Sequence, residues 1–374
     1  MPPRSPVAES IRDTHAVNPL PTLRLGQIEL DFPVVQAALS GYSDWAMRVI
    51  ARRLGAPYTL CEVLLDRFVA EVSASRKAER LLRVTDEEHP VGAQLMGAVP
   101  AEFAPAALRL VDAGFDVIDI NFGCPVKKVL GRQRGGYLLG QVDTALEIVS
   151  RVREAVPPRV PVTVKMRRGL DDTAESRDKF FQIFDGAYER GVAAITVHGR
   201  TVEQKYVGPS RWEFLREVKQ HAGARVVLGS GDLFTPQACL DMLRFTGIDG
   251  VTAARGAIGN PWIFSQARAL AAGQPLPNPP SVYQQRDVIA EHYRLAEQIY
   301  GADRCGRQMR KFGIKYSQLH PHPRAVRDAF VAVSRPHELQ AVLERWYADD
   351  LPGRHPTGAD NNDLTECEAP VVAE

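Results

Sequence analysis

Short apolar runs recur along the first two thirds of the chain and alternate with longer stretches of helical periodicity. The runs are residues 33–38, 58–63, 91–96, 116–121, 162–166, 193–198, 225–228 and 250–254. Between them, stretches such as 101–114 and 143–156 carry apolar residues at every third or fourth position, the spacing of an amphipathic helix. Near-continuous apolar strands that alternate with helices are typical of a parallel sheet covered on both faces. Eight such units over roughly 250 residues predict an α/β fold, a closed (β/α)8 TIM barrel.

The pattern changes on both sides of this repeat. Residues 23–33 alternate apolar and polar positions around Gly26, which predicts a hairpin that closes the floor of the barrel. Residues 273–282 are proline-rich, and beyond them only helical periodicity is found. We therefore expect an N-terminal extension (1–20), a catalytic barrel (21–274), an all-helical domain (281–347) and an acidic, disordered tail (351–374).

Composition narrows the class of protein. Of the 374 residues, 45% are hydrophobic and 24% charged, which is ordinary for a globular protein. No apolar run is long enough to cross a membrane, and the first residues lack a signal-peptide pattern, so we expect a cytoplasmic protein. The five cysteines are scattered and never in CxxC spacing, so neither a disulfide framework nor a metal site is expected. A net charge of +1 gives no global indication of a nucleic-acid partner.

Polar residues follow the predicted strands at the points where the strands end. A TIM barrel carries its functional residues at these carboxyl ends, so we expect a common site there. The residues are Ser40, Gln94, Asn121, Cys124, Lys165, His198, Arg200, Asp232 and Arg255. Polar groups from at least six strand ends predict a functional site and argue against a purely structural barrel.

Small residues and one cation at the ends of the last two strands are typical of a phosphate site. They are Gly229, Ser230, Gly231, Ala254 and Arg255. Backbone N–H groups of such loops bind phosphate in many barrels, although the glycines could also serve only as tight turns. No glycine-rich dinucleotide fingerprint or P-loop occurs.

Three further strand-end residues have side chains suited to chemistry. Lys165 interrupts an apolar strand and could stabilise a reduced flavin, or it could form a structural pair with a glutamate. Cys124 lies on a loop shaped by glycine and proline, where a thiol could act as acid or nucleophile. His198, close to Arg200, could bind a phosphate or a substrate carbonyl, or be structural.

A basic stripe marks the helical domain. Arg304, Arg307, Lys311 and Lys315 recur at intervals of three and four residues, on one face of a predicted helix, and Arg310 adds another charge. This stripe suits the phosphate backbone of a nucleic acid, although a run of charges is more often a solvated surface.

Taken together, these motifs resemble those of the FMN-dependent tRNA-dihydrouridine synthases of bacterial type. The resemblance runs from about residue 33 to residue 332 and is carried by QLMG, DINFGCPVKKVLGRQRGGYLL, VTVKMRRG, TVHGRT, GSGD and RGAIGNPWIF. It implies that FMN is bound by Ala38, Leu39, Ser40, Gln94, Lys165, His198, Ser230, Gly231, Asp232, Ala254 and Arg255. It also implies that Cys124 is the catalytic acid. Asn121 and Arg200, with the basic stripe, would then contact the tRNA.

The implied reaction reduces the 5,6 double bond of a uridine in tRNA. NADPH or NADH would reduce FMN, hydride would pass from flavin N5 to uracil C6, and Cys124 would protonate C5. Two alternatives remain open from the sequence. One is an FMN barrel oxidoreductase of a small molecule, similar to dihydroorotate dehydrogenase, and the other is a non-catalytic tRNA-binding protein that keeps the barrel as a scaffold.

Overall fold

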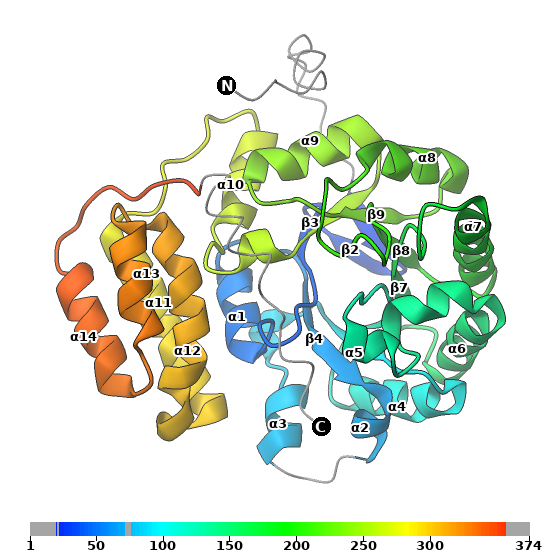
Figure 1. Ribbon diagram of the computed structural model, residues 1–374, viewed down its shortest axis with the longest axis horizontal. Coiled ribbons are helices and arrows are strands. Elements are labelled where there is room, and N and C mark those ends of the chain that lie inside the picture. Colours follow the sequence, from blue (N-terminus) through cyan, green and yellow to red (C-terminus); the bar gives the residue numbers. More distant parts are fainter. Residues whose placement is uncertain (1–19, 21, 72–75, 357–374) are drawn as a thin grey trace.

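Eight parallel strands close into a barrel in the computed structural model, which describes residues 20, 22–71 and 76–356 (Figure 1). The strands are β3 (Val34–Gln36), β4 (Thr59–Leu65), β5 (Val91–Met96), β6 (Val117–Phe122), β7 (Val162–Arg167), β8 (Ala194–His198), β9 (Val227–Ser230) and β10 (Gly250–Ala253). β10 pairs with both β9 and β3, and so closes the ring. Every predicted strand is present, and the prediction of a TIM barrel is confirmed.

Helices between the strands form the outer wall of the barrel. They are α1 (Trp45–Arg53), α2 (Asp66–Glu71), α3 (Arg76–Leu82), α4 (Pro100–Asp112), α5 (Lys127–Leu130), α6 (Val142–Ala155), α7 (Ala174–Glu189), α8 (Trp212–Ala222), α9 (Pro236–Thr246) and α10 (Ile263–Ala271). Local chemistry sets their ends. In α9, for example, the Thr235 hydroxyl accepts a hydrogen bond from the Ala238 N–H, and Gly247 ends the helix with a φ of +71°.

A two-stranded hairpin closes the floor, as the alternating pattern predicted. β1 (Leu23–Leu25) and β2 (Ile28–Leu30) pair antiparallel around a turn in which Gly26 has a φ of +59°. Leu23, Leu25 and Leu30 are buried against residues of the barrel strands. Burial of their apolar surface keeps water out of this end of the barrel and leaves the opposite end as the place for a site.

A separate bundle of helices lies against one side of the barrel, at the left of Figure 1. It consists of α11 (Val282–Tyr300), α12 (Ala302–Tyr316), α13 (Pro323–Val331) and α14 (Pro336–Trp346). This confirms the predicted all-helical region. The expectation of a disordered tail is wrong for residues 351–356, because the Leu351 carbonyl accepts from Val282 N–H at 2.9 Å and Arg354 N–H donates to the Leu319 carbonyl. Residues 1–19 and 357–374 lie outside the described residues.

The helical bundle is joined to both ends of the barrel sequence. The Tyr300 hydroxyl donates to Asp44, the N-cap of α1, at 2.8 Å. On the other side, Gln318 donates to the Ile258 carbonyl at 3.3 Å. The next residue, Gly259, packs so closely on α12 that an added Cβ would lie 2.3 Å from the Lys315 carbonyl carbon. These contacts place the bundle firmly beside the mouth of the barrel.

A buried ion pair connects α1 to the segment that precedes β5. The Arg48 guanidinium binds Glu88 at 2.7 Å, with only 2% and 0% of the two side chains exposed. The second carboxylate oxygen of Glu88 accepts from the backbone and hydroxyl of Thr85, and Arg48 also donates to the Arg83 carbonyl. Both carboxylate oxygens of Glu88 and the Arg48 guanidinium therefore have hydrogen-bond partners, as a buried ion pair requires.

In the part of the chain that the structure describes, no helix has the length and apolar character needed to cross a bilayer. In the same ranges, no group of three or more histidine, cysteine or acidic side chains converges as metal ligands would.

Candidate active site

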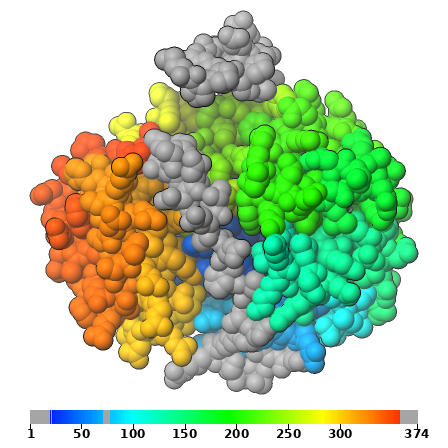
Figure 2. All heavy atoms as spheres, in the orientation of Figure 1, coloured from blue at the N-terminus to red at the C-terminus, as the bar shows by residue number. Residues whose placement is uncertain are grey.

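A cavity of about 580 Å³ opens at the carboxyl ends of the strands. Figure 2 shows the hollow between the helical bundle and the green and teal segments of the barrel. Most of the site residues predicted from the strand ends and from the family resemblance line this cavity. They are Ala38, Leu39, Ser40, Asn121, Cys124, Lys165, His198, Ser230, Gly231, Asp232, Ala254 and Arg255. Gln94 lies beneath the lining, fully buried, where its Oε1 accepts from the Asn121 side chain at 2.7 Å.

Cys124 sits on the loop after β6, in a frame of backbone hydrogen bonds. Its N–H donates to Asn121 Oδ1 at 3.0 Å, and its carbonyl accepts from Gly136 N–H at 3.0 Å. Gly135 packs directly on it, since an added Cβ would lie 2.8 Å from Cys124 Cβ. Burial raises the pKa of the Cys124 thiol above its usual range. A thiol that keeps its proton at neutral pH favours the acid over the nucleophile.

Lys165 extends from β7 into the cavity. Within the described residues its ammonium group forms no hydrogen bond or ion pair, so the structural pair with a glutamate, the alternative left open by the sequence, is not found there. Burial and the charge of Arg167 lower its pKa to about 8, while Asp119 acts in the opposite direction. Lys165 therefore carries a charge at neutral pH that a bound anion or an electron-rich carbonyl could meet.

His198, at the end of β8, is held as a neutral donor. Its Nδ1 accepts from the Arg200 N–H at 3.1 Å, which places the ring proton on Nε2. Burial, and the positive charge of Arg167 and Lys165, lower its pKa well below the usual range. His198 can thus donate to a carbonyl or phosphate oxygen without changing its charge near neutral pH.

The loops after β9 and β10 form a tight cradle that fits a phosphate. Gly231 has a φ of +117°, and a Cβ there would lie 2.4 Å from Ser210 Oγ. A Cβ on Gly256 would lie 2.1 Å from the Leu233 carbonyl oxygen. The guanidinium of Arg255 lies at this end, 3.9 Å from Asp232. Glycine backbone beside a cation is the donor set that an anionic phosphate needs.

Arg200 does not take the predicted substrate-binding position. Its buried guanidinium binds both carboxylate oxygens of Asp232, at 2.7 and 2.8 Å, and its Nε donates to the Gly208 carbonyl at 2.8 Å. Asp232 in turn accepts from the Ser210 N–H. Arg200 therefore fixes the loop after β9 and has no place in the cavity lining, because Asp232 satisfies its charge.

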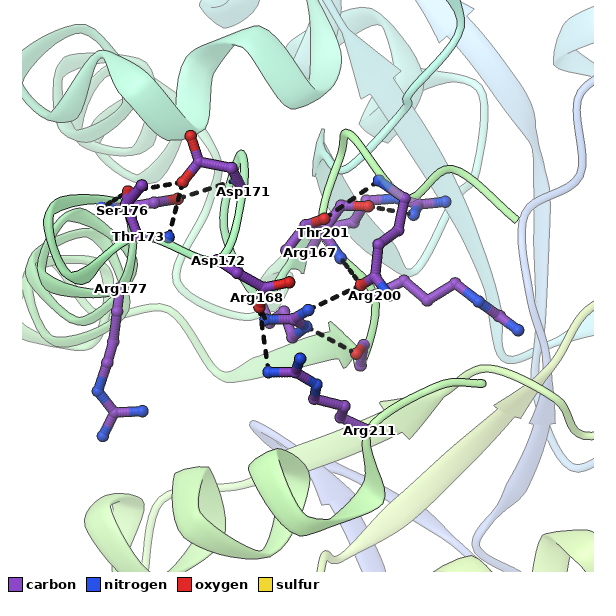
Figure 3. Close-up of polar contacts among 12 residues, drawn as sticks. Arg167, Arg168, Asp171, Asp172, Thr173, Ser176, Arg177, Arg200, Thr201 and Arg211 are labelled. Carbon is purple, nitrogen blue, oxygen red and sulfur yellow. Dashed lines mark hydrogen bonds and ion pairs between the residues drawn. The ribbon is translucent and has the colours of Figure 1, made fainter. Parts of the chain in front are cut away.

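Arg167, the last residue of β7, lines the cavity and is a functional candidate that the strand-end analysis missed; Arg168 follows it in the loop (Figure 3). Arg167 donates to the Gly123 carbonyl at 2.9 Å and to the carbonyls of Thr201 and Lys205 at 2.7 Å each. It thus ties the Cys124 loop to the loop after β8. The signal was present in the motif VTVKMRRG, but a single sequence does not tell which loops an arginine reaches.

Only part of the predicted basic stripe on α12 is exposed to solvent, and the rest contacts the barrel. Arg304 and Arg307 are exposed and Arg310 is half-buried. Lys311 instead donates to the Gly41 carbonyl, with its Nζ 5.2 Å from the centre of the Tyr42 ring. The backbone of half-buried Lys315 packs on Gly259. Lys311 therefore attaches the helical bundle to the loop after β3, which lines the cavity.

Known protein families and proteins include sequences similar to this chain. A model of the dihydrouridine synthase family (Dus) matches residues 35–350. The probable tRNA-dihydrouridine synthase of Mycobacterium tuberculosis is 34% identical over 344 residues, which cover 88% of this chain and 86% of that protein. The tRNA-dihydrouridine synthase B of Xanthomonas campestris pv. campestris is 34% identical over 333 residues, covering 88% and 96% of the two chains.

Solved structures show the same fold at low identity. Histamine dehydrogenase from Rhizobium sp. 4-9 has a TM-score of 0.53 and 16% identity, covering 78% of this chain and 50% of that one. Morphinone reductase in complex with tetrahydroNAD has a TM-score of 0.51 and 16% identity, covering 70% and 93%. The family model spans most of the chain, and relatives above 30% identity align over nearly all of it. The chain therefore belongs to the dihydrouridine synthase family.

Proposed function

We propose that the protein is a tRNA-dihydrouridine synthase that uses FMN and NADPH or NADH to reduce a uridine in tRNA, in the cytoplasm, where its RNA substrate is found. The observation that carries the proposal is the convergence of three groups in one cavity. A protonated thiol (Cys124), a cation (Lys165) and a neutral imidazole donor (His198) line a space whose far end is a phosphate cradle. Membership of the family and the names of the relatives support the same substrate.

The residues divide the work between holding the cofactor and moving a proton. Gly231, Gly256 and Arg255 would hold the ribityl phosphate, and Lys165 and His198 would meet the carbonyl oxygens of the ring. Bound FMN would supply the hydride that saturates the uracil 5,6 bond. Cys124 would give its proton to uracil C5, and the hydride at C6 completes the balance. A base in folded tRNA must leave its stack to reach this cavity, at a cost of a few kcal/mol.

The test is a direct assay. Purified protein is incubated with FMN, NADPH and unmodified tRNA, and dihydrouridine is measured by nucleoside mass spectrometry. Formation of dihydrouridine supports the proposal. A protein that takes up FMN and oxidises NADPH with a small enone or orotate-like acceptor, but leaves tRNA unchanged, is the small-molecule oxidoreductase. A protein that binds tRNA without taking up FMN is the scaffold.

The alkaline limit of the reaction is expected to come from Lys165. His198 stays neutral and Cys124 stays protonated near neutral pH, so turnover should vary little between roughly pH 6 and 7.5. As the pH rises through about 8, Lys165 loses its proton and activity falls. A Lys165→Arg variant keeps its charge, and its loss of activity should move to higher pH. An unchanged alkaline limit in this variant would assign the titration to another group.

The exposed arginines of α12 are expected to contact phosphates of the tRNA. Replacing Arg304 and Arg307 together with alanine should raise the KM for tRNA and reduce the slope of log KM against log salt by roughly 1 to 2. The control is Arg151→Ala, which removes an exposed arginine on the outer helix α6. If both variants show the same slope as the wild type, α12 does not neutralise tRNA phosphates.

A further inference from the structure

A row of buried polar side chains runs from the barrel interior to the loop that carries Cys124. Asn121 Oδ1 accepts from the N–H groups of Gly123 and Cys124 at 2.9 and 3.0 Å. Asn121 Nδ2 donates to Gln94 Oε1 at 2.7 Å, and Gln94 Nε2 donates to Asp119 Oδ2 at 2.6 Å. The remaining Asp119 oxygen accepts from the Thr163 hydroxyl at 2.5 Å. Each carboxamide in the row is thus bound at both of its ends.

The direction of this row is fixed by the backbone. Two N–H donors face Asn121, so its oxygen must point toward the loop and its Nδ2 toward Gln94. Gln94 must then turn its oxygen to Asn121 and its Nε2 inward. The row can end only on an acceptor, and Asp119 supplies one.

Because the row is buried, Gln94 depends on Asp119 as its hydrogen-bond acceptor. Gln94 is 0% exposed and Asp119 2% exposed, so neither side chain can exchange a lost partner for bulk water. A buried donor left without an acceptor costs about 1–3 kcal/mol. Thr163, Thr196 and Thr252 line the same small space as Asp119, and Thr163 supplies the second hydrogen bond to its carboxylate.

We infer that Asp119 is a positioning residue: its side-chain oxygen accepts from Gln94 and so holds the Cys124 loop in place through Gln94 and Asn121. Asp119 itself does not line the cavity of about 580 Å³. Its effect on the reaction is to keep the two N–H groups of the loop on Asn121, and with them the thiol at its place in the cavity. The inference rests on the proposed function, in which that thiol is the proton donor.

An exchange of the acid and the amide tests the row without changing side-chain size. In Gln94→Glu, two carboxylates face each other at the position of the 2.6 Å bond, and they repel unless one takes up a proton. The double variant combines Gln94→Glu with Asp119→Asn. The new amide at position 119 donates to the new carboxylate at position 94 and accepts from the Thr163 hydroxyl. The carboxylate at position 94 also accepts from Asn121, so every hydrogen bond of the row again has a donor and an acceptor. In Asp119→Asn alone, the amide oxygen still accepts from Gln94.

The expected results follow from these bonds. Gln94→Glu should lower kcat for uridine reduction by about tenfold or more, with KM for tRNA little changed. Asp119→Asn alone, and the double variant, should both remain within about threefold of the wild type. If Asp119→Asn fails to rescue Gln94→Glu, Gln94 acts through a contact other than Asp119 and the inference is overturned. Wild-type kcat in Gln94→Glu would overturn it as well.

A second measurement separates this inference from the proposed function. The rate at which iodoacetamide alkylates Cys124, read from the peptide that contains it, needs neither tRNA nor NADPH. Gln94→Glu should alkylate several-fold faster than the wild type, because the loop is released, and the double variant should return to the wild-type rate. This pattern supports the row even if no dihydrouridine forms. Equal alkylation rates in all variants would contradict it, whatever the enzyme's substrate.

Discussion

The Cys124→Ala variant is expected to reduce uridine about 10²–10⁴-fold more slowly than the wild type, the usual contribution of a positioned general acid. The thiol is half-buried in the cavity, and burial raises its pKa, so it holds a proton at neutral pH. Alanine has no proton to give, and water must replace it. Reduction of bound flavin by NADPH precedes this step, so its rate, followed by flavin absorbance, should be unchanged.

The matched control is Cys239→Ala. Cys239 is fully buried in α9, and its loss removes packing without touching the cavity. Dihydrouridine formed in a single turnover, measured for both variants, separates chemistry from stability. A Cys124→Ala enzyme that reduces uridine at the wild-type rate would remove Cys124 from the mechanism and leave the proton source to be found elsewhere.

The Glu88→Ala variant is expected to lower the free energy of unfolding by about 3–5 kcal/mol, the usual cost of breaking a buried ion pair on one side. Its partner Arg48 is enclosed between α1 and the segment before β5, with 2% of its side chain exposed. Without Glu88, the guanidinium has no ion-pair partner among the described residues. Urea unfolding followed by circular dichroism measures the loss.

The adjacent residue offers the control for this prediction. Glu87 pairs with Arg53 at 2.8 Å, but both side chains are about 40% exposed. Solvent screens such a pair, so Glu87→Ala should cost no more than about 1 kcal/mol. Similar losses in the two variants would mean that burial does not decide the strength of the Arg48 pair.

Most of the fold could be predicted because it depends on periodicity. A buried parallel strand reads as a continuous apolar run, and all eight runs became strands within a few residues of their expected bounds. The hairpin and the helical region followed from the same patterns. The first residues after Leu351 were misjudged because their composition is polar, whereas their order comes from backbone hydrogen bonds to Val282 and Leu319 that composition does not reveal.

The site could be predicted only as far as strand ends determine it. Cys124, Lys165 and His198 face the cavity because a barrel strand delivers its last residues there. Arg200 and Lys311 carry the charges that suit RNA, but each finds a partner inside the protein: Asp232 for Arg200 and the Gly41 carbonyl for Lys311. Pairings between residues far apart in sequence decide such cases, and a pattern along the chain does not contain them.

The attachment of the helical bundle has a mechanical consequence for the barrel. The ring closes where β10 meets β3, through three residue pairs. The bundle spans this seam, because α11 is bonded to Asp44 beyond β3 while Gln318, after α12, is bonded to Ile258 beyond β10. The helical bundle therefore connects the first βα unit of the barrel to the last one. We expect a chain cut after residue 274 to lose this connection between the first and the last βα unit, together with helices α11 to α14.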